Sequence, residues 1–175
     1  MIALETIREK LGVSEPWVES RGTHWLNPGA ANIRDVTQAM NAAGARFVTI
    51  TAHELPGDAG LRLEYHWDLQ GWLLGVPFQI AGKSPESAKI DSIYDLCEAA
   101  DWIEREVHEG FAIDFTGRVY EPLLLRAGDK PGVNLREAPV QDNPAPGLQR
   151  ISPVRDRGVR CRGRSSAVSR PRVVR

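Results

Sequence analysis

Residues 91–125 read DSIYDLCEAADWIEREVHEGFAIDFTGRVYEPLLL and form the longest strongly periodic stretch of the chain. The apolar residues in the first half of this stretch recur at helical spacing and line one face. They are Ile93, Leu96, Cys97, Ala100, Ile103 and Val107. We expect this helix to begin at Asp91 or Ser92, either of which can cap it, and to end at Gly110.

Two residues of this helix depart from the pattern of a simple surface helix. At about 100° per residue, Glu104 projects into the apolar stripe, whereas Trp102 projects from the opposite face. A buried carboxylate needs a partner, because an unpaired one is costly or becomes neutral. An exposed Trp leaves a large apolar surface in water. We therefore expect both faces to be covered, the second one by another element of the chain or by another protein.

The composition is typical of one soluble globular domain. The chain has 175 residues, of which 42% are hydrophobic and 26% are charged. No run approaches the ~18 apolar residues of a membrane span. The N-terminus lacks the basic and apolar regions of a signal peptide, and two cysteines are too few for a disulfide framework or a metal knuckle. We therefore expect a cytosolic protein.

Charge is distributed unevenly, although the net charge is only −1. Residues 150–175 contain nine Arg and a single acidic residue, Asp156, so the rest of the chain is acidic. Several Pro residues precede this basic segment. We expect an ordered domain over residues 1–137, a Pro-rich linker over 138–149 and a disordered Arg-rich tail over 150–175.

The residues before the long helix predict an α+β fold. A short amphipathic helix ending at Gly12 comes first, and Asn32 can cap a second helix. Strands are expected over 23–26, 46–53, 61–68 and 72–81. In the second of these, three residues are expected to share one face: Val48, Ile50 and Ala52. We predict an antiparallel sheet meander of three or four strands with helices packed on one face, and with Pro77 at a sheet edge.

No constellation in the sequence identifies an active site. Glu64, His66 and Asp68 could be drawn as a metal site, but alternation places polar residues together on any solvated strand face. Glu104 and Glu106 could form an acid–base pair, but they point about 160° apart on the helix, so a structural or interfacial ion pair is favoured. The Arg-rich tail could bind nucleic acid or anionic lipid, but it lacks interleaved aromatic residues, which favours a solvated extension.

Three blocks around the long helix resemble a family signature. They are residues 93–96 (IYDL), 99–107 (AADWIEREV) and 111–117 (FAIDFTG). Together they resemble the 30 kDa subunit of the peripheral arm of NADH:quinone oxidoreductase. That family shares its ancestry with a component of membrane-bound, energy-converting [NiFe] hydrogenases. The resemblance covers about residues 33–125.

The sequence also departs from the family pattern. Gly110 replaces an apolar residue, Ala112 stands where the family usually has Gly, and Arg118 stands where it has a turn His. Pro122 and Leu123 occupy positions where an Arg pair is common. The family's C-terminal Tyr-Gly-Phe…Pro-Leu-Arg-Lys-Asp-Phe-Pro segment has no counterpart. These departures favour a homologue from a CO-induced or formate-linked hydrogenase over the respiratory 30 kDa subunit.

The resemblance implies a non-catalytic structural subunit that docks the catalytic large subunit of a membrane-associated [NiFe] hydrogenase complex. The alternative is the 30 kDa subunit of respiratory NADH:quinone oxidoreductase; a stand-alone metal or acid–base enzyme and a nucleic-acid binder are less favoured. No cofactor is expected in this subunit. The implied partners are a large subunit and a small Fe–S subunit, peripheral to the cytoplasmic side of the membrane. The residues implied to lock the fold or contact a partner are Trp102, Glu104, Arg105, Glu106, Phe111 and Arg118.

Overall fold

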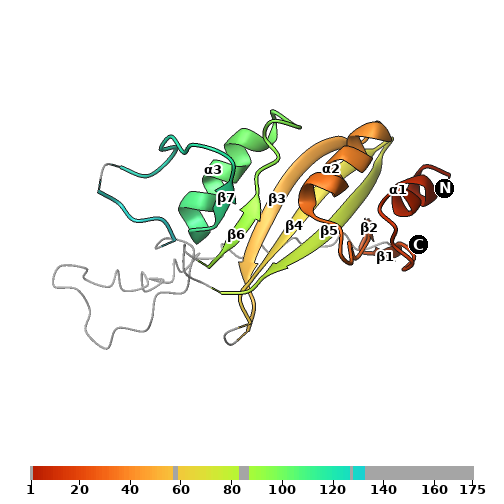
Figure 1. The fold of residues 1–175 in the computed structure, drawn as a ribbon, viewed down its shortest axis with the longest axis horizontal. Coiled ribbons are helices and arrows are strands. Elements are labelled where there is room, and N and C mark those ends of the chain that lie inside the picture. The colour runs from red at the N-terminus through yellow and green to blue at the C-terminus, as the bar shows by residue number, and fades with distance from the viewer. Residues whose placement is uncertain (1, 57–58, 83–86, 127, 133–175) are drawn as a thin grey trace, which may run out of the picture. The chain divides into compact units, whose positions relative to one another are not determined.

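The computed structural model describes residues 2–56, 59–82, 87–126 and 128–132 (Figure 1). The predicted linker and Arg-rich tail lie outside these residues. The elements follow one another as α1 (Ile2–Lys10), β1 (Val18–Ser20), β2 (Thr23–Trp25), α2 (Ile33–Ala42), β3 (Arg46–Glu54), β4 (Leu61–Leu69), β5 (Trp72–Ile80), β6 (Lys89–Asp91), α3 (Ala100–Phe111) and β7 (Asp114–Thr116). This element order confirms the predicted α+β class.

The larger sheet contains five strands in the order β1-β2-β5-β4-β3. The meander of β3, β4 and β5 is antiparallel, as predicted. Two short strands that precede it in the chain extend the sheet, and β2 pairs with β5 in parallel. The sheet is therefore mixed and larger than the predicted three or four antiparallel strands. A separate pair of parallel strands, β6 and β7, brackets α3.

The core lies between one face of this sheet and the helices. β4 alternates strictly, with the side chains from Leu61 to Leu69 at odd positions buried and those between them half-buried. The buried residues of α1, α2 and α3 join these side chains in one cluster, so the helices share that face, as predicted. The predicted cap of α2 is confirmed, because the Asn32 side chain accepts a hydrogen bond from the Asp35 N–H at 2.9 Å.

A bulge in β3 overturns the predicted face assignment of that strand. The pairing with β4 shifts register between Phe47 and Thr49. As a result Phe47 and Ile50 are both buried, whereas Val48 is 38% exposed. The predicted shared face is therefore wrong for Val48, because it assumed an uninterrupted period of two, whereas Ile50 and Ala52 lie opposite Tyr65 and Leu63 on one face.

The edge position of Pro77 agrees with its missing N–H. The Leu26 N–H donates to the Gly75 carbonyl, so the backbone of Gly75 faces β2. Pro77, two residues further on, faces the same side at a point where β2 has already ended. That end of β5 is thus a sheet edge, where a residue without a donor breaks no ladder.

The long helix begins later than its apolar stripe suggested. α3 starts at Ala100, not at Asp91 or Ser92, and Asp91 belongs to β6. Between them, Ile93 accepts hydrogen bonds from the N–H groups of Leu96 and Cys97 and forms an isolated turn. At its other end α3 continues one residue past Gly110 and is closed by a left-handed Ala112 (φ 54°).

Candidate functional site

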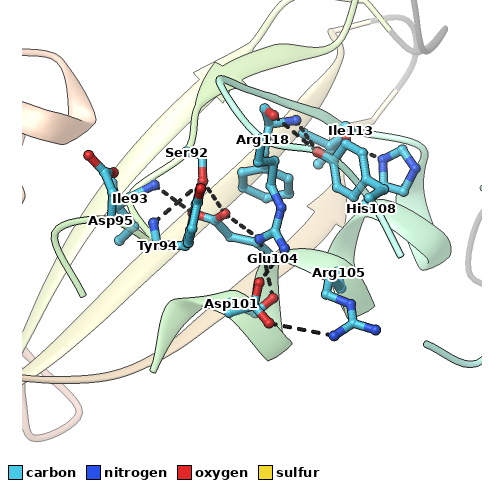
Figure 2. Close-up of polar contacts among 12 residues, drawn as sticks. Ser92, Ile93, Tyr94, Asp95, Asp101, Glu104, Arg105, His108, Ile113 and Arg118 are labelled. Carbon is cyan, nitrogen blue, oxygen red and sulfur yellow. Dashed lines mark hydrogen bonds and ion pairs between the residues drawn. The ribbon is translucent and has the colours of Figure 1, made fainter. Parts of the chain in front are cut away.

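The buried carboxylate of Glu104 is the centre of a polar cluster on the buried side of α3 (Figure 2). Its side chain is 0% exposed and accepts three hydrogen bonds. The donors are the Ser92 hydroxyl at 2.5 Å, the Ile93 N–H at 2.7 Å and Arg118 Nη1 at 2.8 Å. Glu104 is therefore buried and partnered, as its place in the apolar stripe predicted, and it joins α3 to the turn before it and to the segment after it.

Arg118 completes the cluster from the other side. Its side chain is only 4% exposed, and its second terminal nitrogen bonds the Asp101 carboxylate. The guanidinium also lies between the rings of Tyr94 and Tyr120, at 5.1 and 5.2 Å from their centroids. Its Nε is buried without a hydrogen-bond partner among the described atoms. One planar cation thus holds two carboxylates and two rings, a task for which Arg is better shaped than Lys.

The electrostatics of the cluster reflect this burial. Burial raises the pKa of the Glu104 carboxyl, while the bonds from Ile93, Ser92 and Arg118 act in the opposite direction. Burial also disfavours the charged form of Arg118, but Glu104 and Asp101 outweigh it and raise the pKa of the guanidinium. We therefore describe Glu104 and Arg118 as a buried ion pair.

A second contact fixes the segment that returns along α3 after β7. Arg105 donates from Nε to the Glu121 carbonyl at 3.0 Å and from Nη2 to the Pro122 carbonyl at 3.1 Å. Arg105 also forms an ion pair with Asp101 at 3.5 Å. The side chain is 17% exposed, so most of it is taken up by the chain itself.

Glu109 binds the returning segment at a separate point, and the sequence did not reveal this contact. Its carboxylate is 5% exposed and accepts hydrogen bonds from three consecutive N–H groups. They belong to Leu123, Leu124 and Leu125, at 2.5, 2.7 and 3.0 Å. Residues 123–125 have no regular structure, so nothing in the hydrophobic pattern announces a carboxylate bound to their backbone.

The remaining motif residues divide between the core and the surface. Phe111 packs against the core. Trp102 is 60% exposed, and Glu106 is exposed as well. The structure thus brings Glu104, Arg105 and Arg118 into one network and leaves Trp102 and Glu106 outside it. Glu104 and Glu106 do not face each other, as the helical angle predicted.

A hollow opens beside the first turn of α3. The residues that line it come from the turn before α3, from α3 itself and from the returning segment. They are Tyr94, Asp101, Arg105, Gly117, Arg118, Val119 and Glu121. Tyr94 and Val119 are 41% and 88% exposed, so apolar surface borders the charged residues here.

The outer face of β4 carries the other polar set considered from the sequence. Glu64 pairs with Arg62 at 2.9 Å, and burial lowers the pKa of His66. Among the described residues, no group of three or more His, Cys, Asp or Glu side chains is placed to hold a metal ion. Within the residues that the structure describes, no helix has the length and apolarity needed to span a bilayer.

The fold and site define a class: an α+β domain in which one helix binds its own flanking segments through charged side chains. Comparison with known families then places the chain. It belongs to the family described as the 30 kDa subunit of respiratory-chain NADH dehydrogenase, whose model matches residues 28–142. This confirms the resemblance seen in residues 93–117. Ala112 has the left-handed conformation that Gly adopts without strain, and the resemblance implies Gly at this position.

The similarity to an individual curated relative is low and covers only part of each chain. The C subunit of NADH-quinone oxidoreductase from Rhodopseudomonas palustris (strain BisB18) is 28% identical over 96 residues, which are 53% of this chain and 48% of the relative. The chain therefore spans about half the length of this curated relative.

Two solved structures share the fold. One is a chain of the membrane-bound sulfane sulfur reductase, an archaeal respiratory membrane complex. Its TM-score is 0.61 at 23% identity, and the match covers 73% of this chain and 76% of the reductase chain. A trypsin-resistant fragment (1–134) of Nqo5 gives a TM-score of 0.53 at 20% identity, over 68% of this chain and 99% of the fragment.

Proposed function

We propose that the chain is a non-catalytic structural subunit of a membrane-associated oxidoreductase complex and docks the catalytic large subunit. Family membership supports the class of complex. The observation that carries the docking role is that the motif residues of α3 fall into two groups, one bound within the chain and one exposed. Glu104 and Arg105 are consumed by contacts within the chain, whereas Trp102 of the same motif lies 60% exposed on the outside. Trp is enriched at protein interfaces, so the exposed indole beside this rigid internal network supports a docking surface.

Within this class we propose an energy-converting [NiFe] hydrogenase, with respiratory NADH:quinone oxidoreductase as the alternative. The departures at Ala112, Arg118 and Pro122 support the first. Arg118 in particular has a structural role in this chain, because it forms the buried ion pair with Glu104. In this proposal the redox centres belong to the partners, a large subunit and a small Fe–S subunit, and the chain carries no cofactor of its own. The complex lies on the cytoplasmic side of the membrane and the chain touches the membrane only through it.

Purification of the affinity-tagged full chain from its native host, after mild detergent extraction of membranes, tests this proposal. We expect a large oxidoreductase subunit to co-elute in a fixed ratio, identified by mass spectrometry against an untagged strain. Nickel in the complex supports the hydrogenase, and NADH:quinone activity without nickel supports the alternative. Recovery of the chain alone would contradict the docking role.

A further inference from the structure

Three apolar side chains are exposed on the outer side of α3 and on the segments that flank it. Trp102, Tyr94 and Val119 are 60%, 41% and 88% exposed. Tyr94 and Val119 both line the hollow at the start of α3, together with Asp101, which directly precedes Trp102. These side chains come from three segments that the buried ion pair of Glu104 and Arg118 holds together. The three segments that carry these side chains are therefore held in a fixed arrangement.

The charge that reaches solvent on this surface is negative. Glu98, Glu106 and Glu121 are exposed, and the Asp101 side chain is 41% exposed. The nearby cations do not offset them. The side chains of Arg105 and Arg118 are only 17% and 4% exposed. Both are bound to carboxylates and carbonyls of the chain.

Two of these carboxylates flank the exposed indole. Glu106 follows Trp102 by four residues on α3, so the two side chains lie on the same side of the helix. Glu98 precedes Trp102 by four residues, and the helical path already extends back to it. The Asp101 N–H donates to the Glu98 carbonyl at 3.1 Å, and Ala99 has φ −61° and ψ −19°. Neither Glu98 nor Glu106 makes an ion pair or side-chain hydrogen bond within the described part of the chain.

We propose that this surface binds an Arg- or Lys-bearing segment of a partner polypeptide. The indole face attracts a cation, and the carboxylates on either side of it pair with further positive charge. Tyr94 and Val119 cover the apolar stems of the same basic side chains. The proposal rests on the docking role proposed above and names the chemistry of the partner segment.

Charge reversal on the full-length chain tests the proposal. Glu98→Lys with Glu106→Lys places like charge against a basic segment, so we expect the co-purified large subunit to fall about tenfold. The matched control is Glu15→Lys with Glu19→Lys, which adds the same charge at exposed positions near β1 and should leave recovery unchanged. Thermal unfolding of both variants checks that they fold.

Photo-crosslinking identifies the partner segment itself. With Trp102→p-benzoylphenylalanine, irradiation of the assembled complex should attach a peptide that contains Arg or Lys. Exchanging those residues for Glu should restore binding of the Glu98→Lys, Glu106→Lys variant.

The outcomes separate this inference from the docking role. If the wild-type chain retains no oxidoreductase subunit, the docking role fails and the inference fails with it. If the wild-type complex forms but the reversed variant is retained equally, or the crosslink falls on a segment without basic residues, only the inference is overturned.

Discussion

Arg118 Nη1 lies 2.8 Å from Glu104 Oε2, and the two side chains are 4% and 0% exposed. The same arginine also bonds Asp101 at the start of α3. Because Glu104 in addition holds the N–H of Ile93, one buried ion pair fastens α3 to the chain on both sides of it. This attachment fixes the orientation of α3, and therefore which side of the helix faces solvent.

Breaking the buried pair should be the most damaging change in the domain. Glu104→Ala leaves the Arg118 guanidinium buried without its main partner, and we expect a loss of about 3–5 kcal/mol in the free energy of unfolding. Arg118→Ala should cost a similar amount, and the double variant less than the sum. Urea denaturation of the four proteins measures this coupling. A loss below about 0.5 kcal/mol for Glu104→Ala would contradict the assignment.

Glu109 should make stability depend on pH in the acidic range. Burial alone would raise the pKa of its carboxyl, but the hydrogen bonds from Leu123, Leu124 and Leu125 outweigh burial and hold the pKa below its ordinary value. Because the folded-state pKa is lower than the unfolded-state value of ~4.3, the stabilisation is complete above that value and is lost as pH falls through the folded pKa.

Glu109→Gln tests this dependence. We expect the variant to be about 1–3 kcal/mol less stable than the wild type at pH 7, because a neutral amide replaces an ionised acceptor. The difference should shrink below about pH 4. Urea denaturation at several pH values measures it. A difference that stays constant from neutral to acid pH would show that the charge of Glu109 is not responsible.

Gly75 should be required by the ring of Trp25. A Cβ at position 75 would lie 2.7 Å from two ring carbons of Trp25, which packs over this glycine on the outer face of the sheet. Gly75→Ala should therefore destabilise the domain by about 1–3 kcal/mol. In a Trp25→Leu background the same change should cost clearly less, as double-mutant denaturation will show. Equal costs in the two backgrounds would exclude the ring as the cause.

Trp102→Ala should separate docking from folding. Since the side chain is 60% exposed, we expect the free energy of unfolding to change by no more than about 0.5 kcal/mol. Recovery of the large subunit should nevertheless fall. A stability loss comparable to that of Glu104→Ala would mean that Trp102 supports the fold.

The sequence predicted those elements whose patterns are local. The strict alternation of β4 and the Asn32 cap of α2 needed no distant partner to be recognised. The bulge between Phe47 and Thr49 and the parallel pairing of β2 with β5 depend on contacts between distant segments. Periodicity in one segment carries no information about such pairings.

The part of the candidate site that depends on a local pattern was predictable, and the part that depends on distant segments was not. Glu104 was recognised because a carboxylate interrupted an apolar stripe. The start of α3 was misplaced because Ile93 is buried with the same spacing although it lies in a turn. There its N–H binds Glu104, and the neighbouring Ser92 carbonyl binds Arg34 at 2.7 Å. Glu109 was missed because its partners are backbone groups, which every residue except Pro possesses.

The most direct test of the docking role is hydroxyl-radical footprinting of the wild-type chain, alone and in the complex purified from its host. Oxidation of Trp102, located by peptide mass spectrometry, reports solvent access to the outer side of α3. Trp72, which is 42% exposed at the start of β5, serves as the internal reference. We predict that oxidation of Trp102 falls several-fold in the complex while that of Trp72 does not. Equal oxidation of Trp102 in the isolated and assembled chain would contradict the account.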